Sequence, residues 1–265
     1  MASVGDPQLA AEREVGAYLE ALFVPGACLG VRADDPLTSV TVVEVEEVTT
    51  IRVPSGRLIV DSPWSEEAGR EIAARIPPGT YRVEAAWTEA PYEHGGEQFD
   101  GRECAATRLR VSDDPVAVWE AGIGVNDDIG DAEIAAAGFH SDGEATGAIA
   151  DVEAWEVLTA PFHRFRQAAA SWGGSGGDRD TEDLCDGWFE KSTDDDLQAD
   201  LIAFDVAEGW SPVWIGRSRT GAVASIIVPG QMATTPPGLS AALSAALSAV
   251  RPPAGPCPAP SDRAG

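Results

Sequence analysis

The residues best suited to chemistry lie in an acidic, glycine-containing segment in the middle of the chain. Asp142-Gly143-Glu144-Ala145-Thr146-Gly147 is followed closely by Asp151. Glycines let a backbone turn tightly, and clustered carboxylates can bind a hard cation such as Ca²⁺ or Mg²⁺ through oxygen ligands. Glu120 and Asp205 could join them from neighbouring strands. The segment therefore predicts a divalent-metal site with Asp142, Asp151 and Asp205 as ligands.

The same residues also fit a purely structural role. Asp and Gly are common in turns, and Asp151 could cap a helix that carries Val152, Trp155 and Leu158. No EF-hand spacing starts at Asp142. In this alternative the segment is a β-turn followed by a capped helix, and it binds no ion.

Glu120 is the candidate for acid–base catalysis. It follows Trp119 in the sequence, and burial of a carboxyl group against an aromatic ring raises its pKa. The competing interpretation is an outward-facing glutamate on a strand, since most glutamates are exposed. Of the three histidines only His140 lies beside the acidic segment, and none has metal-ligand spacing to another.

Two further patterns have a functional and a structural interpretation. Residues 173–177 read Gly-Gly-Ser-Gly-Gly, but a nucleophile elbow needs a buried strand before the serine and a helix after it, so we interpret this segment as a flexible linker. Trp210 and Trp214 flank a loop and could form a stacking platform for a sugar or a partner. Packing in the core or at an edge is the alternative for both rings.

Acidic residues dominate the composition. The chain of 265 residues has 18 Lys+Arg and 44 Asp+Glu, a formal net charge of −26. Such a surface repels phosphate backbones and anionic membranes, so we expect no nucleic-acid or membrane partner. The acidic run at 178–200 could instead occupy a basic protein, as a mimic of nucleic acid. The alternative is a solvated, partly disordered loop. Lys191 is the only lysine of the chain, which indicates that the acidity reflects a general bias in composition and is not specific to this run.

Strands are the elements expected to position most of these residues. A helix should start at Asp6-Pro7 and end at Pro25-Gly26. The segment after residue 61 is expected to be helical or looped as far as residue 75. Alternating and β-branched patterns predict strands at 39–53, 57–60, 80–87, 104–111, 116–121, 201–204, 212–215 and 222–228.

These elements predict an α+β fold that is mostly antiparallel β, with a sandwich-like core and a few peripheral helices. We divide the chain into an N-terminal helix and lead-in (1–34), a β-rich core domain (35–230), and a Leu/Ser/Ala helix with a disordered Pro-rich tail (231–265). No signal peptide or long apolar stretch is evident, and the four cysteines form no Cys-x-x-Cys pair. A cytoplasmic protein with reduced thiols is therefore expected.

Several turns and strands carry recognisable motifs. Residues 53–63 contain a Gly-Arg-hydrophobic run that ends in Asp-Ser-Pro, 76–81 read Ile-Pro-Pro-Gly-Thr-Tyr, and 116–120 end in Val-Trp-Glu. The segments 138–151 and 203–228 complete the pattern. Together, over about residues 40–230, they resemble the bacterial family known as domain of unknown function 4241. The resemblance implies a shared fold and supplies no activity.

The chain departs from the family pattern at two places. A Ser-Gly-Trp-Gly-Asp-Gly turn of the family is reduced here to 207–211, and Pro229-Gly230 stand where the family closes with Asp-Phe. If the family has a site in those loops, the resemblance implies that this chain lacks part of it.

The sequence favours a non-enzymatic binding or interaction protein that is soluble and acidic, with a basic protein as its expected partner. The alternative is a hydrolase that depends on a divalent metal held by the clustered carboxylates.

Overall fold

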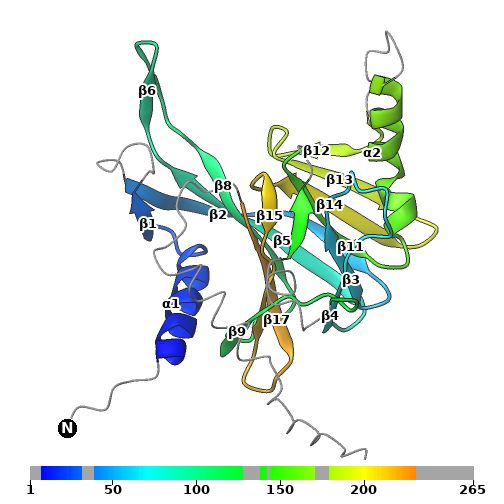
Figure 1. Cartoon of the computed structure of the whole chain (residues 1–265), viewed down its shortest axis with the longest axis horizontal. Helices are drawn as coiled ribbons and strands as arrows, with labels where there is room; N and C mark the ends of the chain where they lie inside the picture. The colour runs from blue at the N-terminus through cyan, green and yellow to red at the C-terminus, as the bar shows by residue number, and fades with distance from the viewer. Residues whose placement is uncertain (1–6, 32–38, 128–137, 142–143, 171–178, 231–265) are drawn as a thin grey trace, which may run out of the picture.

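The structure is a computed structural model, and it describes residues 7–31, 39–127, 138–141, 144–170 and 179–230 (Figure 1). Strands make up most of this part of the chain, and all of their pairings are antiparallel. The mostly-β fold with few helices that the sequence predicts is thus confirmed. Strand formation follows from the alternating and β-branched patterns along the chain.

Seven strands form the first sheet. In spatial order they are β1 (Cys28–Val31), β2 (Ser39–Val53), β5 (Gly79–Glu89), β8 (Glu103–Arg110), β17 (Val223–Pro229), β16 (Trp214–Arg217) and β9 (Val118–Ala121).

Six strands form the second sheet. In spatial order they are β12 (Glu182–Leu184), β13 (Phe189–Asp194), β14 (Ala199–Asp205), β11 (Thr146–Asp151), β3 (Arg57–Asp61) and β4 (Glu71–Arg75). The chain just after β9 continues the hydrogen bonding onto β4, because Ala73 N donates to Ile123 O at 2.8 Å and Val125 N donates to Glu71 O at 2.8 Å. The first sheet therefore curls round into the second along this side.

Two short two-stranded sheets and two helices complete the fold. β10 (Phe139–Ser141) pairs with β15 (Gly209–Ser211), and β6 (Tyr92–His94) pairs with β7 (Glu97–Phe99). Helix α1 (Pro7–Ala21) lies beside the first sheet and α2 (Trp155–Ala170) beside the second, at opposite sides of the molecule (Figure 1). Neither helix is long and apolar enough to cross a membrane, and no other helix occurs among the described residues.

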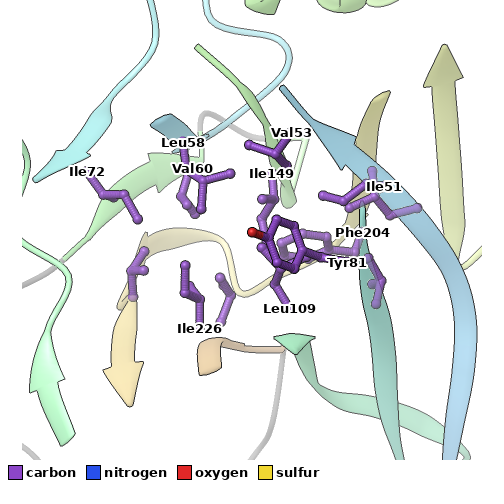
Figure 2. Close-up of a cluster of buried hydrophobic side chains, with 14 of the residues drawn as sticks. Ile51, Val53, Leu58, Val60, Ile72, Tyr81, Leu109, Ile149, Phe204 and Ile226 are labelled. Carbon is purple, nitrogen blue, oxygen red and sulfur yellow. The ribbon is translucent and has the colours of Figure 1, made fainter. Parts of the chain in front are cut away.

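The main core lies between the two sheets, where Ile51 and Leu109 from the first sheet meet Ile149 and Phe204 from the second (Figure 2). Because side chains alternate between the two faces of each strand, the opposite face of each sheet packs against a helix. On β5, for example, Trp87 faces the main core, whereas the neighbouring Ala86 packs in the cluster under α1. The order of layers is thus α1, first sheet, second sheet, α2.

The turn between β2 and β3 needs a glycine. Gly56 has a φ of +70°, and a Cβ at this position would lie 2.2 Å from the backbone oxygen of Ile76. Only glycine adopts this conformation without a steric penalty and leaves room for the neighbouring chain. The break between the strands predicted at 39–53 and 57–60 is thus a turn, and Gly56 is the residue that permits it.

Two expectations from the sequence are wrong. Residues 71–75, expected in a helical or looped segment, form β4. The acidic run at 178–200, expected as a solvated loop in the structural interpretation, forms β12, β13 and the start of β14 from residue 182 on. Both segments become strands because they pair with neighbours that are distant in sequence, and local composition carries no signal of that pairing. Residues 231–265 lie outside the described residues.

Candidate ligand-binding site

A cavity of about 420 Å³ lies between the end of α1 and the outer face of the first sheet. We call it the α1 cavity. Leu19, Phe23 and Val24 line it from the helix and the turn that follows, and the loop 112–116 lines its rim. The sheet contributes side chains from β8, β17 and β9. Its volume lies within the range of about 300–1,000 Å³ that is usual for small-molecule sites.

The register of the first sheet brings the polar residues of the cavity together. Arg110 on β8 lies opposite Ser225 on β17, Ser225 lies opposite Gly216 on β16, and Gly216 lies opposite Trp119 on β9. Directly opposed residues of an antiparallel sheet project to the same face. Four strands therefore place an arginine, a serine and a tryptophan in one row, and all three side chains line the cavity.

Glycines make room for the Trp119 ring at the end of this row. A Cβ at Gly216 would lie 2.9 Å from Cζ3 of Trp119, and a Cβ at Gly16 of α1 would lie 3.3 Å from its Cδ1. The indole therefore fits between the helix and β16, where larger residues would displace it. The two glycines thus allow the Trp119 ring to pack closely against both α1 and β16.

Two polar atoms of the cavity are buried without a partner. The Oγ of Ser225 and the Nε1 of Trp119 are inaccessible to solvent and form no hydrogen bond with any residue that the structure describes, and Ser225 as a whole is only 6% exposed. An unpaired buried polar group costs about 1–3 kcal/mol, so each such group in a native protein calls for an explanation. Neither atom has accessible surface, so neither can bind a ligand unless the side chains around it move.

Charged groups surround this row on the same face of the sheet. The Nε of Arg108 donates to Oε2 of the buried Glu84 at 2.6 Å, and a terminal nitrogen of Arg110 lies 3.6 Å from Oε1 of Glu84. Arg82 and Arg110 both donate to Oδ1 of the exposed Asp113, at 2.8 and 3.0 Å. Three guanidinium groups thus face these two carboxylates. Glu20 and Asp114 also line the cavity, so its charged surroundings carry three positive and four negative charges.

Arg108 also connects the cluster to the helix. Its guanidinium lies over the ring of Phe23, 3.9 Å from the ring centre, and this cation–π contact stabilises the position of the turn after α1. Burial lowers the pKa of Arg108, and the charge of Glu84 opposes that shift. Arginine remains protonated at neutral pH, so the group supplies a fixed positive charge.

The first predicted metal ligand, Asp151, serves as a structural tie. Its side chain is fully buried, with Oδ2 accepting from Ser55 N at 2.7 Å and Oδ1 accepting from Glu153 N at 2.9 Å. The backbone oxygen of Asp151 accepts from Ala154 N, just before α2 begins at Trp155. The alternative that the sequence left open, a turn and cap at this residue, accounts for both carboxylate oxygens.

The other two predicted ligands do not lie beside it. Asp205 is paired with Thr146, at the opposite end of β11 from Asp151. Asp142 lies outside the described residues. Among the residues described, no group of three or more His, Cys, Asp or Glu side chains could hold a metal ion. The metal site therefore stays a prediction, one that now depends on Asp142.

Asp205 lines a smaller, polar cavity of about 260 Å³ together with Glu144, Glu190 and Arg179. Burial raises the pKa of Asp205, and the charge of Glu190 adds to the shift. Arg179 is bound to Glu190 at 2.5 Å, so the one guanidinium in this lining already has a carboxylate partner. The arrangement resembles a local charge network more than a ligand cradle.

The remaining predicted residues are dispersed. Glu120, the acid–base candidate, is an exposed residue of β9 that accepts from Arg217 Nε at 2.6 Å, as an outward-facing strand glutamate would. Trp214 is buried under α1, whereas Trp210 is exposed and contacts the edge of His140, so the two rings do not share a surface. The Gly-x-Ser-x-Gly segment lies outside the described residues.

Sequence reasoning missed Arg110 and Ser225. They are more than a hundred residues apart, and only the pairing of β8 with β17 places them side by side. One signal was present in the sequence, because Trp119 belongs to the Val-Trp-Glu motif at 118–120.

Comparison with known proteins gives one match. The model of a family described as "Protein of unknown function (DUF4241)" matches residues 51–228. The sheet residues of the α1 cavity lie within this range, whereas the α1 residues that cover it precede it. No curated protein and no solved structure matches the chain significantly.

Proposed function

The chain belongs to the DUF4241 family, whose description names no activity, so we propose from the site alone that this protein is a non-enzymatic binding protein for a small molecule. The observation that carries the proposal is a cavity of about 420 Å³, which is of ligand size, and whose lining combines the apolar Leu19 and Phe23 with Arg110. Binding sites of this kind combine apolar walls with a few convergent polar groups.

The experiment uses two fluorescent probes and two matched tryptophan variants. 8-Anilinonaphthalene-1-sulfonate and the neutral N-phenyl-1-naphthylamine have the same aromatic body. Val24 lines the cavity and is 52% exposed, so Val24→Trp should obstruct the site without disturbing the core. Val157 on α2 is 51% exposed and far from the cavity, so Val157→Trp is the control.

We expect at least one probe to bind the wild type with a stoichiometry of one. Val24→Trp should weaken that binding about tenfold or more, and Val157→Trp should leave it unchanged. Absence of binding by both probes, or equal binding by both variants, would refute the proposed function.

A basic protein partner is a second proposal, favoured by the β6–β7 hairpin. This hairpin projects from the body of the molecule (Figure 1). Tyr92 and Phe99 stack at its base with ring centres 5.1 Å apart and are partly exposed, and Glu93 and Glu97 are exposed beside them. An aromatic pair next to acidic residues is suited to a basic protein surface.

The partner proposal is tested by pull-down from the native host in moderate salt. The wild type should recover a basic protein that the double variant Tyr92→Ser/Phe99→Ser does not recover. Recovery of the same proteins by both would contradict a role for the hairpin, and recovery of no basic protein would contradict the partner itself. A cytoplasmic location is proposed with it, supported by Cys28, Cys104 and Cys185, which form no disulfide in the described part of the chain.

A further inference from the structure

We propose that α1 is a lid, which opens as a unit while the two sheets stay folded, and that its opening admits the ligand to the α1 cavity. The second part of this inference rests on the proposed function and deepens it, because it names the step that controls access to the cavity. Four features carry the inference: the contacts that hold α1, their contrast with those of α2, the glycine inside α1 and the hinge that follows it.

Apolar packing holds α1 on the first sheet. Val15, Leu19 and Leu22 pack in the cluster on the outer face of that sheet. Within the part of the chain that the structure describes, no hydrogen bond or ion pair joins a residue of α1 to a strand. The cation–π contact between Phe23 and Arg108 fixes the turn after the helix and not the helix itself. α1 can therefore leave the sheet without breaking a polar contact to it.

The other helix, α2, is tied more firmly. His163 Nε2 lies 2.9 Å from the backbone oxygen of Ser65, and Arg166 Nη1 donates to the backbone oxygen of Trp64 at 3.0 Å. These hydrogen bonds link α2 to the loop between β3 and β4 in addition to its apolar packing. Segments with fewer such contacts open at a lower free energy than the rest of a protein. We therefore expect α1 to open more readily than α2, which serves as the matched comparison.

Gly16 brings α1 close to the sheet and weakens the helix. A glycine inside a helix is less favourable than an alanine, because its unfolded backbone has more conformational freedom. A Cβ at Gly16 would lie 3.3 Å from Cδ1 of Trp119, the atom bonded to the buried Nε1. α1 thus covers the polar edge of this indole, and lifting the helix exposes that edge of the cavity lining.

A hinge and an anchor follow the helix. Gly26 N donates to Val42 O at 2.7 Å, and Val42 N donates to Ala27 O at 2.9 Å, so the chain is fixed to β2 from Gly26 onwards. α1 ends at Ala21, and residues 22–25 form the turn between the helix and this anchor. Gly26 has a φ of +87°, and a Cβ there would meet no atom within 4 Å. The turn can therefore change direction without a clash at the anchor.

Hydrogen exchange of the ¹⁵N-labelled full chain tests the lid without a ligand. We expect the backbone amides of α1 to exchange at least about tenfold faster than those of α2 and of β17. The indole N–H of Trp119 should exchange faster than that of Trp155, which is also buried without a partner but packs with α2. Exchange of α1 and the sheets at one common rate would overturn the lid, because α1 would then open only in global unfolding.

Leu22→Ala and Leu158→Ala are the matched variants. Both leucines are buried, Leu22 under α1 and Leu158 on α2, and neither lines the α1 cavity. Leu22→Ala removes packing that holds α1 closed, so it should speed exchange of the α1 amides about tenfold or more and leave the α2 amides unchanged. Leu158→Ala should leave the α1 amides unchanged. Equal acceleration of both helices by Leu22→Ala would overturn the lid.

Stopped-flow binding of the fluorescent probe tests the gate. If α1 must open before the probe enters, the observed rate constant levels off as the probe concentration rises, at a value set by the opening rate. That plateau should be about tenfold higher in Leu22→Ala than in the wild type and unchanged in Leu158→Ala. A rate constant that rises linearly with probe concentration and is the same in all three proteins would overturn the gate.

The outcomes distinguish the inference from the proposed function. If α1 exchanges together with the sheets while a probe binds, the lid is overturned and the cavity remains a binding site. If neither probe binds the wild type, the proposed function and the gate fall together, and hydrogen exchange still decides whether α1 opens.

Discussion

One ion pair, between Arg52 and Asp200, joins the two sheets, and Asp200 lies at the end of the acidic run 178–200. Asp200 on β14 is buried and accepts hydrogen bonds from the backbone N, Nε and Nη2 of Arg52 on β2, each at 2.9 Å, and from Oγ1 of Thr193 at 2.8 Å. Burial raises the pKa of Asp200, but the hydrogen bonds from Arg52 and Thr193 outweigh it, and the net effect lowers the pKa below its ordinary value of 3.8.

Asp200→Asn should therefore destabilise the protein by about 3 kcal/mol at pH 7, since it leaves the guanidinium without its buried partner. Because the folded pKa is depressed, the contribution of Asp200 is fully present above pH 3.8 and is lost as the pH falls through the folded pKa. Urea unfolding of both proteins should show a difference that is constant near neutrality and shrinks below about pH 4.

The matched control is Asp195→Asn. Asp195 also accepts from Arg52, at 3.2 Å, but its side chain is exposed, so its loss should cost about 0.5 kcal/mol or less. Equal effects of the two substitutions would contradict the assignment of Asp200 as the tie between the sheets.

At the scale of elements, the sequence predicts a strand correctly where apolar and polar residues alternate regularly. It misses a strand that forms only because it pairs with a neighbour distant in sequence. β2 and β5 were predicted because alternate apolar residues pack in the main core. β13 was missed because Phe189 and Ser192 are its only buried residues, and the polar remainder resembles a loop. β13 is a strand because it pairs along its whole length with the apolar β14, a tertiary contact that composition does not encode.

The candidate site was missed for the same reason. The sequence prediction had Asp205 join Asp151 as a ligand from a neighbouring strand, but the two residues lie beside opposite ends of β11. Arg110 and Ser225 are unremarkable in sequence, and the register of four strands makes them neighbours of Trp119. Convergence of residues from different strands is a property of the sheet, so it could not be predicted from local patterns.

The connection between the β2–β3 turn and α2 gives an element-scale prediction. Asp151→Asn should lower the free energy of unfolding by about 2 kcal/mol, since an amide can replace only one of the two acceptors that bind Ser55 N and Glu153 N. The loss, measured by urea unfolding, should be the same in EDTA and in millimolar Ca²⁺ or Mg²⁺. Asp180→Asn, at an exposed position, should have no effect.

The metal-dependent hydrolase predicts a different result from the same experiment. Its metal would bind only the folded protein, so Ca²⁺ or Mg²⁺ would raise the melting temperature of the wild type, and Asp151→Asn would abolish the rise. That outcome would contradict a purely structural role for Asp151 and restore the carboxylate site.

At the scale of the whole molecule, the chain has a formal net charge of −26, and its described part is a β structure with a helix on each side (Figure 1). Self-repulsion of this size destabilises a compact state, and salt screens it. Raising NaCl from about 10 mM to about 0.15 M shortens the Debye length from about 30 to about 8 Å, and we expect the melting temperature to rise by a few degrees. Choline chloride at the same concentration should raise the melting temperature by the same amount. A rise with divalent cations alone would indicate specific binding instead of screening.

The central claim is that the α1 cavity, whose lining includes Trp119, binds a small molecule. Indole N–H resonances of a ¹⁵N-labelled protein report on it directly, with the Trp119 signal assigned from Trp119→Phe. Titration with the naphthalene probe that binds the wild type should shift the Trp119 resonance and leave that of Trp155, which packs with α2 on the other side of the molecule, unchanged. A Trp119 resonance that does not move at saturating probe, or that moves no more than that of Trp155, would contradict the account.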